Sequence, residues 1–93
     1  MNSPYYKSLA KKIPASIRER DLLSPQDLIN NAVASPQDPY VKKLAKIWYM
    51  FIEPNGDLDM GCGKCLSNVI SNFKELLPEL KALKQEEELL NQL

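Results

Sequence analysis

The stretch GKCLSNVISNFKELLPELKALKQEEELLNQ, residues 63–92, decides the fold of this 93-residue chain. Its apolar residues recur in alternating steps of three and four, the heptad spacing of an amphipathic helix. We therefore expect one long helix here. Two further apolar positions widen the stripe, which suits a globular core better than a two-stranded coil. The seam consists of Leu66, Val69, Phe73, Leu76, Leu80 and Leu83, with Ile70 and Leu77 beside it.

Two positions interrupt this pattern. Pro78 lacks a backbone N–H and its ring clashes with the carbonyl of Lys74, so we expect a kink or a break there. Glu87 stands where the next seam residue belongs, and Leu90 resumes the spacing. We interpret residues 79–93 as a protruding amphipathic tail whose leucines need cover from the domain or from another chain. The candidate contact residues are Leu80, Leu83, Leu89, Leu90 and Leu93.

Shorter helices are expected before residue 53. Ser-Pro pairs mark helix starts, because serine caps free amides and proline fits the first turn. The pairs are Ser3-Pro4, Ser24-Pro25 and Ser35-Pro36. The expected helices span about residues 4–12, 25–34 and 39–52, with a turn of helix near 16–21. Asp38, followed by Pro39, should cap the third helix, with Ser35 as the alternative cap. The apolar stripe of this helix is the strongest of the three and includes Trp48 as a packing residue.

These expectations define the fold class as all-α. Three shorter helices pack on a long C-terminal helix kinked near Pro78, in a single domain that covers residues 1–93. A domain of this size has a small core, so a partner, a second copy or a metal would add stability.

Ser24 and Asp27 also resemble a capping box at the start of the second helix.

Composition excludes several classes of protein. Twelve basic and twelve acidic residues give a formal net charge of zero, which argues against a strongly basic nucleic-acid binder. No apolar run approaches the roughly 18 residues of a membrane helix, and the first residues lack the apolar core of a secretory signal. The absence of histidine excludes histidine-based catalysis and ligation. We expect a cytoplasmic protein, or a virion component if the chain is phage-encoded.

Charge is unevenly distributed along the chain. Residues 1–53 carry eight basic and five acidic side chains, and residues 54–93 carry four and seven. This polarity could orient head-to-tail assembly or docking. Lys11, Lys12, Arg18 and Arg20 form a candidate patch for nucleic acid or for an acidic protein surface. We expect a protein partner or a second copy rather than nucleic acid, and no membrane.

The densest group of reactive side chains surrounds Cys62 and Cys65, a CxxC motif at the expected start of the long helix. A metal half-site is one interpretation, completed by Asp57 and Asp59 or by the cysteines of a second copy holding zinc. Redox chemistry is another, because a helix start and Lys64 stabilise a thiolate. A third is structural, with Cys65 as a small buried residue. No catalytic residue and no resident cofactor is expected, with zinc as the alternative.

Three features follow one another in the second half of the chain. An aromatic helix with Trp48-Tyr49 is followed by a short turn, and then by Cys62-Gly63-Lys64-Cys65, which leads into a leucine-rich helix. Over roughly residues 48–77 the chain resembles small helical CxxC proteins encoded by phages and mobile elements of the Bacteroidetes. The resemblance implies no enzymatic activity and an accessory role, as a virion component or a factor acting on a host protein. We therefore expect a non-enzymatic assembly or interaction protein. A thiol module and a nucleic-acid accessory protein are the alternatives.

Overall fold

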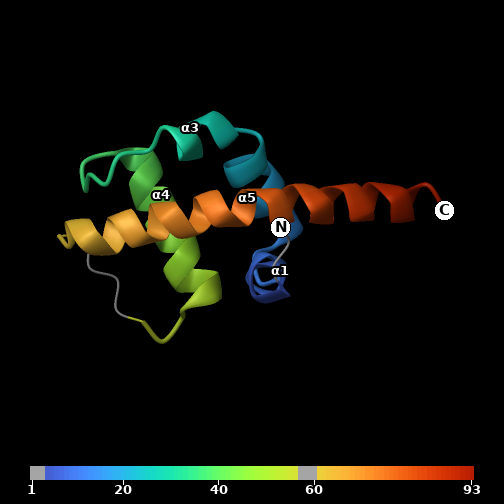
Figure 1. The fold of residues 1–93 in the computed structure, drawn as a ribbon, viewed down its shortest axis with the longest axis horizontal. Helices are drawn as coiled ribbons and strands as arrows, with labels where there is room; N and C mark the ends of the chain where they lie inside the picture. Colours follow the sequence, from blue (N-terminus) through green and yellow to red (C-terminus); the bar gives the residue numbers. More distant parts are fainter. Residues whose placement is uncertain (1–3, 57–60) are drawn as a thin grey trace.

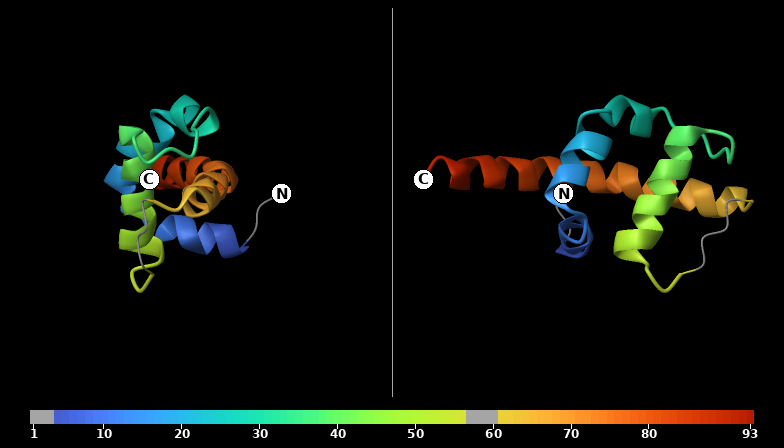
Figure 2. Two further views of the ribbon diagram at one scale, coloured as in Figure 1. Left: turned by 90° about the vertical axis from the view of Figure 1, so that its left-hand side faces the viewer. Right: turned by 180° about the vertical axis from the view of Figure 1, so that it is seen from behind.

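The computed structural model describes residues 4–56 and 61–93, and all regular elements within these ranges are helical. The long helix α5 (Gly63–Asn91) is the axis of the molecule, as Figure 1 shows. The other elements are α1 (Pro4–Lys11), α2 (Ala15–Ile17), η1 (Arg18–Leu23), α3 (Gln26–Asn30), α4 (Pro39–Ile47) and η2 (Trp48–Ile52). Figure 2 shows α1, α3 and α4 on different sides of α5. The predicted all-α bundle on a long C-terminal helix is confirmed.

The core lies along the predicted seam of α5. All six seam residues are at most 5% exposed, and Ile70 and Leu77 are buried beside them. Trp48 packs edge-to-face against Phe73, with ring centroids 5.7 Å apart, so the predicted packing role of the tryptophan is confirmed. The helix does not break at Pro78, which lies inside α5 on its exposed side.

The segment between α1 and α3 is tightly wound. Ile13 and Leu22 are fully buried, and the chain passes from α2 directly into η1. The amide of Ser24 donates to the carbonyl of Glu19 at 2.9 Å, a bond across five residues that makes η1 a π-helix. Ser24 therefore ends η1. It does not cap α3, whose N-cap residue Pro25 makes no side-chain bond.

The predicted helix over residues 39–52 forms, but it changes from the α-helix α4 to the π-helix η2 after Ile47. The side chain of Asp38 accepts a hydrogen bond from the amide of Tyr40 at 2.9 Å, so Asp38 is the N-cap, as expected. α4 continues without interruption into η2, where the amide of Glu53 donates to the carbonyl of Trp48. The last turn is thus a second π-helical segment.

The predicted helix over residues 25–34 is the one that differs most. α3 covers only residues 26–30, and the side chain of Asn31 turns back to bond the carbonyl of Asp27. Of the apolar residues in this segment, Ile29 is fully buried, but Leu28 and Val33 are 52% and 70% exposed. Because Leu28 and Val33 bury little surface, packing adds little to extend this helix beyond Asn30.

The molecule measures 47 × 26 × 24 Å because the C-terminal end of α5 extends past the other helices (Figures 1 and 2). Within the described residues, no helix combines the length and apolarity needed to cross a bilayer.

Candidate functional site

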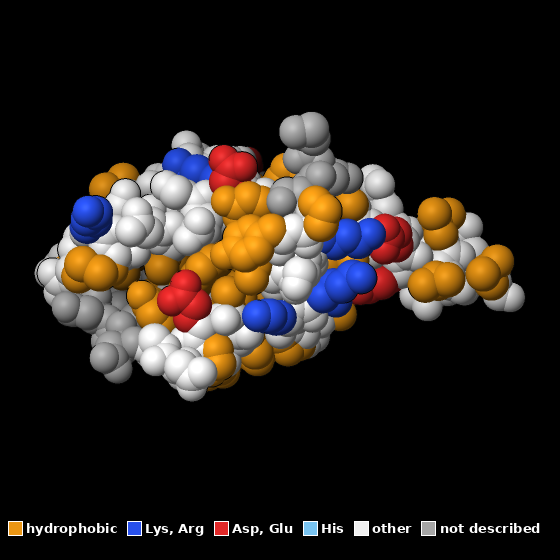
Figure 3. Space-filling view, turned by 60° about the horizontal axis from the view of Figure 1, so that its bottom comes forward, with side chains coloured by type: hydrophobic (Ala, Val, Ile, Leu, Met, Phe, Trp, Pro, Cys, Tyr) orange, Lys and Arg blue, Asp and Glu red, His pale blue; other side chains and the backbone are white. Residues whose placement is uncertain are grey.

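The projecting end of α5 carries an exposed apolar surface. Leu89, Leu90 and Leu93 are 64%, 66% and 100% exposed. Glu86, Leu89 and Leu90 follow the spacing i, i+3, i+4, which places them on one face of α5, and Leu93 follows two residues after the helix ends at Asn91. Figure 3 shows hydrophobic side chains gathered at this end, beyond the last charged groups. We call this the tail surface: Glu86, Leu89, Leu90, Gln92 and Leu93, which line a shallow hollow.

Three ion pairs hold α5 against the N-terminal elements just before the tail surface, and we refer to them as the clamp. Lys7 reaches Glu86 at 3.2 Å from α1, and Arg18 reaches Glu87 at 2.9 Å from η1. The third pair joins Lys84 to Glu19 at 3.3 Å. Surface ion pairs are individually weak, but these three join one stretch of α5 to both α1 and η1. The leucines beyond the clamp lie on the part of the chain that extends past the other helices (Figure 1).

The contact residues expected from the sequence divide into two groups. Leu80 and Leu83 are 0% and 5% exposed and belong to the core of this chain, which corrects their assignment as contact residues. Both α1 and η1 pack on α5, and Arg18, Glu19 and Leu23 of η1 lie around Leu80. The side chains that remain available are Leu89, Leu90 and Leu93.

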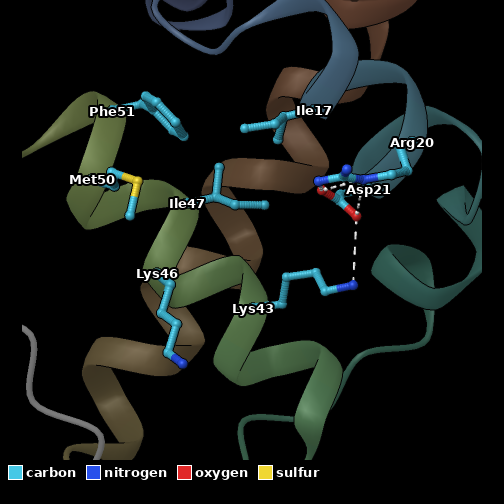
Figure 4. Close-up of a pocket in the computed structure, with 8 residues that line it drawn as sticks. All are labelled: Ile17, Arg20, Asp21, Lys43, Lys46, Ile47, Met50 and Phe51. Atoms are coloured by element: carbon cyan, nitrogen blue, oxygen red, sulfur yellow. Dashed lines mark hydrogen bonds and ion pairs between the residues drawn. The ribbon is translucent and has the colours of Figure 1, made fainter.

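A second feature is an open groove of about 520 Å³ between η1 and the α4–η2 segment (Figure 4). Its apolar lining comes from both sides, and Met50 on its rim is 64% exposed. Both π-helical segments contribute to it, and π-helical turns recur at functional sites of proteins. We call it the groove; its lining is Ile17, Arg20, Asp21, Lys43, Lys46, Ile47, Met50 and Phe51.

The polar end of the groove is organised around Asp21. Its carboxylate accepts from Arg20 Nη2 at 2.9 Å and lies 3.5 Å from Lys43 Nζ. The Arg20 hydrogen bonds hold the pKa of Asp21 below its ordinary value, against the opposing effect of burial. The Tyr40 hydroxyl donates to the carbonyl of Asp21 at 2.7 Å. Burial, with the charge of Asp21, raises the pKa of Tyr40 to about 12.

Lys46 differs from the other two bases of the groove. Its side chain points away from Asp21 in Figure 4, and among the described residues it makes no ion pair. Arg20 and Lys43 already share the carboxylate of Asp21. The groove therefore presents an excess of positive charge beside an apolar floor.

The cysteine pair is joined by a disulfide at the start of α5, with the Cα atoms of Cys62 and Cys65 5.2 Å apart. Cys62 is the N-cap, and its Sγ accepts a hydrogen bond from the amide of Cys65 at 3.1 Å. In this oxidised state neither sulfur is a thiolate ligand. No third metal-ligating side chain joins them within the described part of the chain, and Asp57 and Asp59 lie outside it.

The four bases of the predicted N-terminal patch differ in what they contact. Arg18 is engaged with Glu87 and also donates from Nε to the carbonyl of Ile13 at 2.9 Å. Arg20 is engaged with Asp21. Lys11 and Lys12 are exposed, and neither forms an ion pair within residues 4–56 and 61–93.

Comparison of the chain with protein-family models, curated proteins and solved structures finds no match. The resemblance to phage-encoded CxxC proteins therefore stays a prediction. The groove was not anticipated from the sequence, because its two walls are more than twenty residues apart. The available signal was Asp21, an acidic residue among basic neighbours that proved to be 7% exposed.

Proposed function

We propose that this chain is a non-enzymatic assembly protein that associates with copies of itself through the tail surface. The observation that carries the proposal is the exposure of Leu89 and Leu90 at the end of α5, and of Leu93 just after it, beyond the clamp. Complete burial of a leucine side chain is worth about 1.5–3 kcal/mol. Three such side chains on a rigid helix provide a strong apolar contribution to association, with few side chains to immobilise.

The test compares the oligomeric state of the intact chain with that of a variant carrying Leu89→Gln, Leu90→Gln and Leu93→Gln. Glutamine favours helix about as well as leucine, so α5 should persist. The matched control carries Leu28→Gln and Val33→Gln, two exposed apolar residues far from the tail surface. Sedimentation equilibrium should show an oligomer for the intact chain and the control, and a monomer for the tail variant. A monomeric intact chain, or an unchanged tail variant, would overturn the proposal.

The disulfide supports a second candidate function, in which Cys62 and Cys65 act as a reversible thiol pair. Its formation releases two protons and two electrons, which glutathione disulfide accepts as it becomes two thiols. The position at a helix N-terminus stabilises a thiolate in the reduced state. Reduced pairs from two copies would also supply the four thiolates of a shared zinc site.

Glutathione buffers of graded ratio, followed by alkylation and mass measurement, test this candidate. The pair should titrate between two states while α5 stays helical by circular dichroism. Zinc added to reduced protein should bind at one ion per two chains only if the shared site exists. A pair that remains in one state across all buffers, and binds no zinc when chemically reduced, would remove both forms of the thiol proposal.

A further inference from the structure

We infer that the tail surface of one copy docks in the groove of a second copy. This inference rests on the proposed self-association and names the surface that receives the tail. The tail surface provides three leucines and a glutamate at the C-terminal end of α5. The groove provides an apolar floor with a basic rim, so the two surfaces are complementary in both polarity and charge.

The apolar match involves side chains that are incompletely covered within one chain. Met50 is 64% exposed, and Ile17 and Phe51 are partly exposed on the two walls of the groove. Figure 4 shows Ile17, Ile47 and Phe51 converging from α2, α4 and η2. Leu89 to Leu93 spans about 6 Å at 1.5 Å per residue, a little over one helical turn. A single turn of helix laid into the groove would cover these groups together with the leucines.

The charge match gives the docking its direction. Three bases and one carboxylate line the groove, a formal excess of two positive charges. Lys46 has no carboxylate partner among the described residues, and neither does Glu88, which precedes the leucines of the tail. Packing two tails against each other would instead bring like charges together. Opposite charges favour the groove over a second tail as the receiving surface.

The clamp excludes the groove of the same chain as the docking site. Lys7 and Arg18 join α5 to the N-terminal elements at Glu86 and Glu87, and the helix runs without a break to Asn91, so its last turn continues outward and does not fold back. The contact is therefore intermolecular and heterologous: one copy contributes its tail surface and the other contributes its groove. Such contacts close as a reciprocal pair or a ring, or continue as an open chain of copies.

The test uses two variants that each lack one surface. The tail variant carries Leu89→Gln, Leu90→Gln and Leu93→Gln; the groove variant carries Lys46→Glu and Met50→Glu, both at exposed positions. Lys74→Glu with Val33→Glu repeats the charge and polarity changes of the groove variant at exposed sites elsewhere. Circular dichroism and melting of each variant check that the fold is retained.

Each variant alone should sediment as a monomer, while the control associates like the intact chain. An equal mixture of the tail and groove variants should form a one-to-one heterodimer, because one member keeps its groove and the other keeps its tail. Added salt should weaken this heterodimer at least severalfold. If only the tail variant is monomeric and the groove variant still associates, the groove is not the receiving surface, although the proposed function stands. If the tail variant associates, both proposals are overturned.

Discussion

Arg18 Nη2 lies 2.9 Å from Glu87 Oε1, which joins the start of η1 to a position 69 residues later on α5. Glu87 occupies the place in the heptad seam where an apolar residue belongs. The ion pair explains this interruption. At position 87 the neighbouring side chain is the charged Arg18, whereas the earlier seam residues pack in the apolar core. Arg18 also donates to the carbonyl of Ile13, so its guanidinium ties three segments together.

The Arg18 guanidinium should stabilise the fold more than its ion pair alone. Arg18→Ala removes both the pair and the bond to Ile13, and we expect the free energy of unfolding to fall by about 2 kcal/mol. Glu87→Gln removes only the charge of a half-exposed partner, and we expect a loss below about 1 kcal/mol. Urea denaturation of both variants measures the difference. Equal losses would show that the Ile13 bond contributes nothing.

Leu80 and Leu90 provide a matched pair for separating core from tail surface. Leu80 is 0% exposed and Leu90 is 66% exposed, on the same helix. Leu80→Ala leaves a cavity and should cost about 2–5 kcal/mol of unfolding free energy. Leu90→Ala should change it by less than about 0.5 kcal/mol in dilute, dissociated protein. Thermal or urea unfolding at low concentration makes the comparison, and a large loss at Leu90 would place that residue in the core of the monomer.

Tyr40 should make the fold sensitive to alkali. Its pKa is raised from 10.0 to about 12 by burial and by Asp21. Because the folded value exceeds the unfolded one, this contribution is complete below pH 10 and is lost as the pH rises towards 12. Absorbance titration of tyrosinate should show a step near pH 12 that Tyr40→Phe removes. Asp21→Asn should move the step to lower pH, and an unmoved step would exclude the charge of Asp21 as a cause.

Cys62 should cap α5 even without the disulfide. In a Cys65→Ala background no bond can form within the chain, so the cap is measured by itself. Serine at position 62 can accept from the amide of residue 65 as the sulfur does, whereas alanine cannot. We expect Cys62→Ser to be more stable than Cys62→Ala by about 1 kcal/mol in this background. Equal melting temperatures would indicate that the helix start needs no cap.

Much of the fold could be predicted from local patterns. The seam from Leu66 to Leu83 is buried as its spacing predicts, and Asp38 caps α4 as the adjacent proline suggested. Both signals depend on residues within one or two helical turns of each other. The pattern failed for residues 25–34, where four apolar residues at helical spacing yielded only a short helix. Nothing local indicated that Leu28 and Val33 would find no neighbour to cover them.

In the candidate sites too, some features follow from local sequence patterns and others depend on the packing of distant segments. The sequence by itself determined the helical class, the long apolar stripe, the capping residue of α4 and an apolar tail on a charged helix, because periodicity and turn chemistry are local. Only the tertiary structure decided that Leu80 is core while Leu90 is exposed, and that η1 and α4 form a groove with Asp21 at its polar end. Burial depends on which distant segments pack together. The apolar spacing along one helix does not show which of its residues those segments will cover.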